Sequence, residues 1–157
     1  MNISEEVVHL LTEKGLKIAT AESCTGGLLA KCITDVSGAS AVFDYGIVSY
    51  SNEIKWSQLG VRRKTVETYG AVSEQTAAEM AQCAAKNSGA DIGLSTTGIA
   101  GPTGGTEQKP NGTCFIGVYH NGKVAVHKVS TGLSDRDANR KQFAAKALEL
   151  VKEEIHG

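Results

Sequence analysis

The sequence predicts an α/β fold, a three-layer α/β/α sandwich with a mixed sheet, and three observations lead to this prediction. Segments with helical periodicity alternate with short strand patterns through residues 1–99, which is typical of parallel strands joined by helices. Two adjacent strand patterns follow, separated by Asn121-Gly122, the dipeptide that best fits a tight hairpin turn. A final amphipathic helix then supplies further cover for the sheet.

The first half of the chain alternates between helix and strand. Ser4 is placed to cap a first helix that Gly15 ends, and the alternating segment LKIAT predicts a strand after it. GLLAKCITDVSG has helical spacing, and VFDYGIVSY is a β-branched and aromatic strand pattern. Asn52 can cap the short helix EIKWSQL, and KTVETYG adds another helical turn.

The second half contains the hairpin and the longest segment without periodicity. Ser73 is placed to cap the alanine-rich helix EQTAAEMAQCAAKNS, and DIGLSTTG predicts a strand that leads into the irregular segment IAGPTGGTEQKPNG. TCFIGVYH and KVAVHKVS predict the strands of the hairpin. Ser134 and Asp137 resemble a capping box at the start of the last helix. The apolar face of that helix contains Phe143, Ala144, Ala147, Leu148, Val151 and Ile155.

Composition predicts one domain over residues 1–157. A hydrophobic fraction of 41% with 21% charged residues argues against disorder, and a net charge of −1 argues against a general nucleic-acid binder. The N-terminus resembles no signal peptide, and no apolar window is long enough to span a membrane. We therefore expect a soluble cytoplasmic protein with reduced cysteines. The spacing of its histidines and cysteines fits no metal site.

The segment TAESCTGG joins the first strand to the next helix and contains the first candidate nucleophile, Ser23. Unpaired N–H groups at a helix start favour an oxyanion at this place. Considered alone, Ser23 or Thr25 more commonly caps such a helix, and the G-x-S-x-G sequence of a nucleophile elbow is absent. Cys24 would need a base beside it to act as a nucleophile, and no histidine is suitably placed. We therefore expect Cys24 to be a small buried residue that only fills space in the interior.

A partly desolvated lysine can replace histidine as the base for a serine. SYSNEIK places Tyr50 at the end of a strand and Lys55 in the first turn of the next helix. If the two strand-to-helix junctions are neighbours, both residues meet Ser23 at the sheet edge where open α/β sheets bind ligands. The alternatives are a solvated helix lysine and an ordinary strand-end aromatic residue.

The glycine-rich loop and the last helix contain candidate ligand-binding groups. The loop lacks both the Walker pattern and G-x-G-x-x-G, but its glycines permit close backbone approach to a ligand, and Thr96 and Thr97 supply hydroxyls. Arg136 and Arg140 lie one helical turn apart and can clamp an anion together. A flexible loop and a solvated helix face are the alternatives for these two features.

Four ordered blocks, TAESCTGGLLA, YGIVSYSNEIK, GAVSEQTAAEMA and TGIAGPTGGTEQKPNGT, resemble the CinA C-terminal domain family. The resemblance runs from about residue 16 to residue 142. It implies a nicotinamide-nucleotide amidohydrolase (NMN deamidase) that uses Ser23, Tyr50 and Lys55 without a metal or cofactor. Larger members of the family have an additional N-terminal domain, so the resemblance is to the stand-alone form.

The resemblance also implies the residues around a small nucleotide substrate. These are Thr25, Gly26, Thr96, Thr97, Gly98, Gly101, Gly104, Gly105, Arg136 and Arg140. Two departures from the family pattern affect the pocket, namely Thr96-Thr97 in place of serine-glycine and Asn111 in place of an apolar residue. We expect a homo-oligomer with no nucleic-acid or membrane partner. Two alternatives stay open, a nucleotide- or partner-binding module without turnover and an amidase for another small amide.

Overall fold

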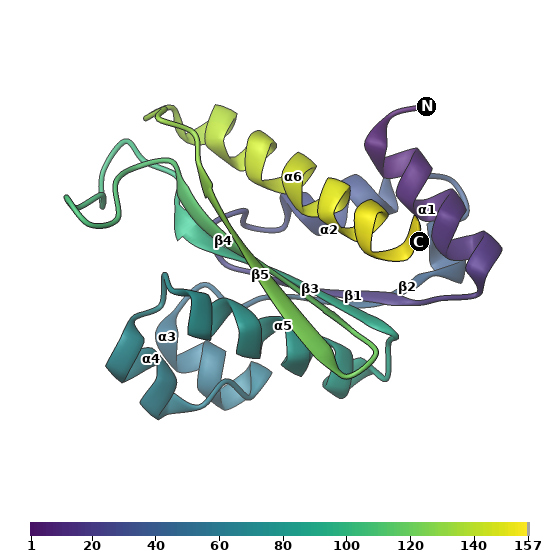
Figure 1. Ribbon diagram of the computed structural model, residues 1–157, viewed down its shortest axis with the longest axis horizontal. Helices are drawn as coiled ribbons and strands as arrows, with labels where there is room; N and C mark the ends of the chain where they lie inside the picture. Colours follow the sequence, from purple (N-terminus) through teal and green to yellow (C-terminus); the bar gives the residue numbers. More distant parts are fainter. Residues whose placement is uncertain (157) are drawn as a thin grey trace.

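A computed structural model describes residues 1–156 and contains a five-stranded mixed sheet between two layers of helices (Figure 1). The strands are β1 (Ile18–Glu22), β2 (Phe43–Val48), β3 (Ile92–Ile99), β4 (Thr113–His120) and β5 (Lys123–Ser130). Their order in the sheet is β2-β1-β3-β4-β5. β1 is parallel to β2 and β3, whereas β4 is antiparallel to β3 and β5. The predicted three-layer α/β/α fold class is confirmed.

The helices divide between the two faces of the sheet. They are α1 (Ile3–Lys14), α2 (Leu28–Thr34), α3 (Asn52–Ile54), α4 (Arg63–Tyr69), α5 (Glu74–Ser88) and α6 (Arg136–His156), with a 3₁₀ turn at Ala39–Ala41 and a π-helical turn at Lys55–Leu59. α1, α2 and α6 cover one face, and α3, α4 and α5 cover the other (Figure 1). No helix within residues 1–156 combines the length and the apolar character needed to cross a membrane.

Each face of the sheet has its own hydrophobic core because strand side chains alternate between the two faces. Ile18 of β1 belongs to the larger core with α1, α2 and α6, while Ala19 and Ala21 belong to the smaller core with α5. All five residues of β1 are buried. The central position of this strand therefore fixes the segment that follows it, which contains Ser23.

Three helix starts differ from the predicted ones. The capping residues are Asn2 for α1, Ser51 for α3 and Asp135 for α6, in place of Ser4, Asn52 and Ser134. Each observed cap accepts a hydrogen bond from a first-turn N–H group, which a side chain can do from just outside a helix. Ser4 and Asn52 already lie inside their helices. Ser73 caps α5 as predicted.

Helix α5 packs closely on the sheet because glycines face it. A Cβ atom on Gly93 would overlap the carbonyl group of Ala81, and one on Gly117 would overlap that of Ala77. Between these glycines, the hydroxyl of Ser95 donates a hydrogen bond of 2.6 Å to the carbonyl oxygen of Ala77. The backbone of α5 is therefore held directly against β3 and β4.

The connections between the parallel strands lie on opposite faces of the sheet. The connection from β1 to β2 lies on one face, and the connection from β2 to β3, on the other side of β1, lies on the opposite face. α2 connects β1 to β2, and α3, α4 and α5 connect β2 to β3. A reversal of this kind opens a crevice at the carboxyl ends of the parallel strands, where ligands commonly bind. β1 ends just before Ser23 and β2 just before Tyr50, so both candidate segments lie at this crevice.

Candidate active site

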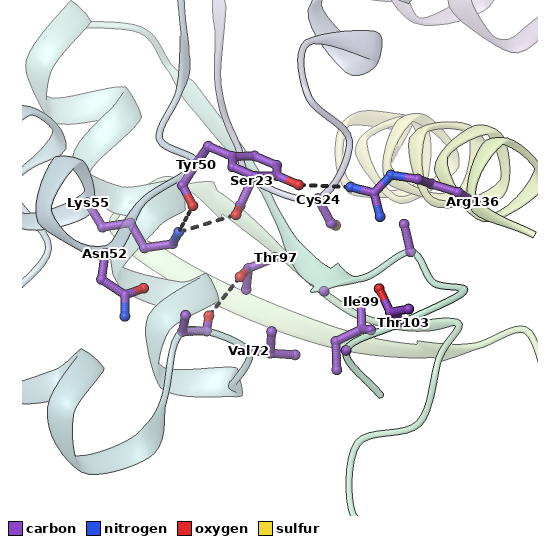
Figure 2. A pocket seen from close by; sticks show the side chains of 14 residues that line it. Ser23, Cys24, Tyr50, Asn52, Lys55, Val72, Thr97, Ile99, Thr103 and Arg136 are labelled. Carbon is purple, nitrogen blue, oxygen red and sulfur yellow. Dashed lines mark hydrogen bonds between the residues drawn. The ribbon is translucent and has the colours of Figure 1, made fainter. Parts of the chain in front are cut away.

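A pocket of about 280 Å³ opens at the carboxyl ends of the parallel strands (Figure 2). The predicted site residues that line it are Ser23, Tyr50, Lys55, Thr97, Gly98, Gly104 and Arg136. Pockets for small ligands usually measure about 300–1,000 Å³. This pocket lies just below that range and suits one ring of a ligand, with the remainder extending outward.

Lys55 is the buried amine of the pocket, with 1% of its surface exposed. Its Nζ donates to the hydroxyl of Ser23 at 3.2 Å and to the carbonyl oxygen of Tyr50 at 3.4 Å (Figure 2). It also donates to the carbonyl oxygen of Ser49 at 2.8 Å. Burial lowers the pKa of Lys55 from 10.5 to about 8, although the charge of a Cys24 thiolate acts in the opposite direction. The amine can therefore lose its proton near neutral pH.

A widened helical turn places Lys55 in the interior. The N–H of Gly60 donates to the carbonyl oxygen of Lys55, five residues earlier, at 3.1 Å, which is the spacing of a π-helical turn. The N–H of Val61 donates to the same oxygen at 2.9 Å. Such turns are rare and occur frequently at functional sites. Within residues 1–156 no carboxylate forms an ion pair with Lys55, so no acidic side chain offsets the effect of desolvation.

Ser23 lies at the first position after β1. Its N–H donates to the carbonyl oxygen of Thr96 at 3.0 Å, which continues the pairing of β1 with β3 by one residue. In the described part of the chain, the N–H groups of Cys24 and Thr25 have no hydrogen-bond partner. The N–H that follows a nucleophile commonly stabilises the oxyanion in a strand–turn–helix site. These two N–H groups are therefore candidate oxyanion donors.

Glu22 is a site residue that sequence analysis missed. Its buried carboxylate accepts the N–H groups of Gly27, Leu29 and Ala30, at 3.2, 2.8 and 3.0 Å, and the hydroxyl of Thr25. Glu22 thus satisfies the start of α2, and neither Ser23 nor Thr25 caps that helix as considered above. A carboxylate near a helix N-terminus is electrostatically favourable, and this acidic residue just before a helical pattern was the available signal.

Other predicted substrate-binding residues lie outside the pocket lining. They are Thr25, Gly26, Thr96, Gly101, Gly105 and Arg140. The hydroxyls of Thr25 and Thr96 are buried and hydrogen-bonded to each other at 2.7 Å. Gly101 and Gly105 pack against Asn111, so the loop folds on itself at these positions. This set supports the walls of the pocket in the described structure.

The two arginines of α6 have different surroundings. Arg136 lines the pocket, and its guanidinium donates to the carbonyl oxygen of Gly101 and to the hydroxyl of Tyr50, both at 2.8 Å. Arg140 donates from Nε to the carbonyl oxygen of Cys24 at 2.9 Å and lies outside the lining. Arg136 is therefore the better candidate to bind an anionic part of a ligand.

The hydroxyl of Tyr50 points to Arg136, away from the Ser23–Lys55 contact (Figure 2). The residue is 56% exposed, and it is the backbone carbonyl of Tyr50 that accepts a hydrogen bond from Lys55. A proton relay between Ser23 and Lys55 through this hydroxyl would need it to contact both groups, and no such relay is formed in this arrangement. The ring instead lies where it can cover an aromatic ligand in the pocket.

Further lining residues were not predicted from the sequence as ligand-binding groups. They include Asn52, Val72, Ile99 and Thr103, which add apolar and hydrogen-bonding surface. All but Val72 lie in or beside segments already considered for their chemistry, whereas Val72 comes from the turn before α5. Among residues 1–156, no group of three or more histidine, cysteine, aspartate or glutamate side chains is arranged to hold a metal ion.

Comparison with known proteins identifies similar sequences over nearly the whole chain. The family model of the CinA C-terminal domain matches residues 1–155. A CinA-like protein from Kosmotoga olearia is 54% identical over 151 residues, covering 96% of this chain and 36% of the relative. A CinA-like protein from Chloroherpeton thalassium is 49% identical over 156 residues, covering 98% and 37%. The chain thus spans little more than a third of these curated relatives.

Solved structures share the fold as well. The competence/damage inducible protein CihA from Agrobacterium tumefaciens has a TM-score of 0.94 and 40% sequence identity, covering 99% of this chain and 94% of that one. A CinA superfamily protein from Klebsiella pneumoniae has a TM-score of 0.94 and 32% identity, covering 98% and 96%. The similarity therefore includes both the strands and the loops that form the pocket.

Proposed function

This chain belongs to the CinA C-terminal domain family, and on that premise we propose that it is a serine amidase that converts nicotinamide mononucleotide to nicotinate mononucleotide and ammonia. One observation carries the proposal, the 3.2 Å contact between Lys55 Nζ and Ser23 Oγ at the base of the pocket. A buried lysine with a pKa of about 8 can act as a base, and a serine hydroxyl in contact with it can act as a nucleophile.

In the proposed reaction, neutral Lys55 accepts the proton of the Ser23 hydroxyl while its oxygen attacks the carboxamide carbon. The N–H groups of Cys24 and Thr25 stabilise the negative charge that develops on the carboxamide oxygen. Lys55 then donates the proton to the departing nitrogen, which leaves as ammonia, and an ester remains on Ser23. Lys55 next activates a water molecule, which hydrolyses the ester and releases the acid product.

The shape of the pocket supports a pyridine carboxamide as the reacting group. The ring would lie between the apolar side chains of Val72 and Ile99 and the ring of Tyr50, which all line the pocket. The phosphate would then extend outward to Arg136, the arginine that faces the cavity. A guanidinium is well suited to a phosphate because its N–H groups match two phosphate oxygens.

The direct test is ammonia release from nicotinamide mononucleotide, with free nicotinamide and the dinucleotide as comparison substrates. Ser23→Ala should reduce turnover on the order of 10³-fold or more and keep nucleotide affinity in calorimetry. The exposed Ser57 gives a matched control, Ser57→Ala, which should retain turnover. Loss of activity in Cys24→Ala with activity kept in Ser23→Ala would assign the reaction to the thiol. Binding without turnover of any of the three substrates would indicate a binding module.

A further inference from the structure

Two cysteines meet on the pocket wall beside the candidate nucleophile. Cys24 directly follows Ser23, Cys114 belongs to β4, and their Sγ atoms lie 3.7 Å apart. Cys24 lines the pocket and is 5% exposed, whereas Cys114 is fully buried in the larger core (Figure 2 shows Cys24). The remaining cysteines of the described chain, Cys32 and Cys83, are half-buried and have no thiol neighbour.

We propose that Cys24 and Cys114 form an oxidation site, at which a small peroxide entering the pocket converts the thiol pair to a disulfide and stops chemistry at Ser23. The disulfide itself does not depend on the proposed amidase activity, whereas the loss of turnover does. The pair would thus make the pocket sensitive to peroxide in a protein with reduced thiols.

The proposed oxidation consumes one hydrogen peroxide and yields two water molecules. The Cys24 sulfur attacks one peroxide oxygen, the O–O bond breaks, and the products are a sulfenic acid on Cys24 and one water. The Cys114 sulfur then attacks the Cys24 sulfur, so that the S–S bond forms and the S–O bond breaks. The hydroxide that leaves takes the proton of the Cys114 thiol and becomes the second water. Two thiols are oxidised and the peroxide is reduced.

The surroundings of the two thiols indicate which one reacts with peroxide and which one then forms the disulfide. Cys24 lines the pocket together with Lys55, so it is the thiol that a small molecule in the pocket can reach. Burial raises the pKa of the Cys114 thiol well above 9.0, so this group keeps its proton until the sulfenic acid has formed. Cys24 is therefore the peroxide-reactive thiol, and Cys114 is the resolving thiol.

Closing the disulfide requires movement at Ser23. The sulfur atoms must approach from 3.7 Å to about 2.0 Å. Cys114 pairs with Gly98 in adjacent central strands, and the backbone is so close there that a Cβ on Gly98 would overlap Cys114. Because β4 is held in this way, we expect the turn that contains Cys24 to supply the movement and to carry the adjoining Ser23 with it. A misplacement of about 1 Å at reacting groups can reduce a rate on the order of 100-fold.

The experiment exposes the wild-type chain to hydrogen peroxide under native conditions, alkylates the remaining thiols and maps the peptides by mass spectrometry. We expect a linked peptide pair containing Cys24 and Cys114 that is two hydrogens lighter than the separate peptides and disappears with dithiothreitol. Cys32 and Cys83 serve as internal controls and should stay alkylated. Absence of the linked pair in protein that circular dichroism shows to be folded would overturn the proposal.

Turnover of nicotinamide mononucleotide should fall on the order of 100-fold as the linked pair accumulates, and return with dithiothreitol. In Cys114→Ala, Cys24 lacks its resolving thiol and should proceed to sulfinic acid, which dithiothreitol does not reverse. Full turnover of the linked protein would refute the switch. If the untreated protein has no turnover, the proposed function fails, but the peptide masses still decide whether the oxidation site exists.

Discussion

Replacing Lys55 with methionine should stabilise the fold at neutral pH, because the lysine charge is held in a buried site without a counter-ion. The pKa falls from 10.5 to about 8, a difference of about 2.5, so the charged form costs about 3 kcal/mol in the folded state. Methionine fills similar space without this cost, but the carbonyl oxygen of Ser49 loses its donor, which costs about 1 kcal/mol. Ser23 and Tyr50 lose a donor as well, but both line the pocket, where water can replace the lysine. The expected net gain is about 2 kcal/mol at about pH 7.

The same reasoning predicts how the gain depends on pH. Lys55 loses its proton near pH 8 in the folded protein and near 10.5 in the unfolded chain. Between these values the unfolded chain binds more protons, so the lysine contributes increasing stability as the pH rises. Its penalty is complete below about pH 8 and absent above about 10.5. From about pH 7 to about pH 9.5 the wild type should therefore recover about 2 kcal/mol relative to Lys55→Met.

Urea denaturation of the wild type and of Lys55→Met at the two pH values measures this change in the free energy of unfolding. The titration of all other groups is the same in both proteins and cancels when one free energy is subtracted from the other. The exposed Lys64 provides the control Lys64→Met, whose difference from wild type should stay constant with pH. A constant difference for Lys55→Met as well would refute the reasoning, because burial would then leave the proton affinity of Lys55 unchanged. In the same experiment series, kcat/KM of the wild type should rise with pH and level off above about 8.

Four further substitutions test the surroundings of the site. Glu22→Gln should lower the free energy of unfolding by about 1–3 kcal/mol in urea denaturation, because one amide oxygen cannot replace two carboxylate oxygens that accept backbone N–H groups. Arg136→Ala should raise KM for the nucleotide about tenfold or more. Arg140→Ala removes the donor to the Cys24 carbonyl oxygen and should mainly lower kcat. Equal increases in KM for the two variants would show that the phosphate binds elsewhere. Tyr50→Phe should cost less than about tenfold in kcat, and a loss of about 100-fold or more would restore the relay role of the hydroxyl.

The parts of the fold that depend on local sequence were predictable. The hairpin strands have the predicted bounds because Asn121 and Gly122 adopt φ values of 53° and 77°, a conformation that this dipeptide favours. Helix caps were displaced by one or two residues, since neighbouring polar residues have similar capping preferences. The direction from which the backbone enters a helix decides between Ser51 and Asn52, and that direction depends on tertiary structure.

Two features of the site depend on packing across the sheet, and periodicity does not reveal them. A lysine in a short helical segment is usually solvated, but the π-helical turn directs Lys55 into the interior. The carboxylate of Glu22 accepts hydrogen bonds from residues up to eight positions away, which required the start of α2 to be located first. By contrast, the convergence of Ser23 with Lys55 follows from the general rule that parallel strands present their carboxyl ends at one edge.

Because α5 packs closely on the sheet, the two sides of the pocket should differ in how well they tolerate substitutions during directed evolution. On one side, the wall contains Ala71, which precedes α5 and whose carbonyl oxygen accepts a hydrogen bond of 2.7 Å from the hydroxyl of Thr97. Gly93 and Gly117 hold α5 itself against the sheet, so this wall cannot retreat without separating a helix from its sheet. On the other side, the loop 100–112 and the exposed ring of Tyr50 can change shape at little cost to either core. Variants selected to accept bulkier amides should therefore gather their substitutions on the loop and around Tyr50, and leave the α5 side unchanged.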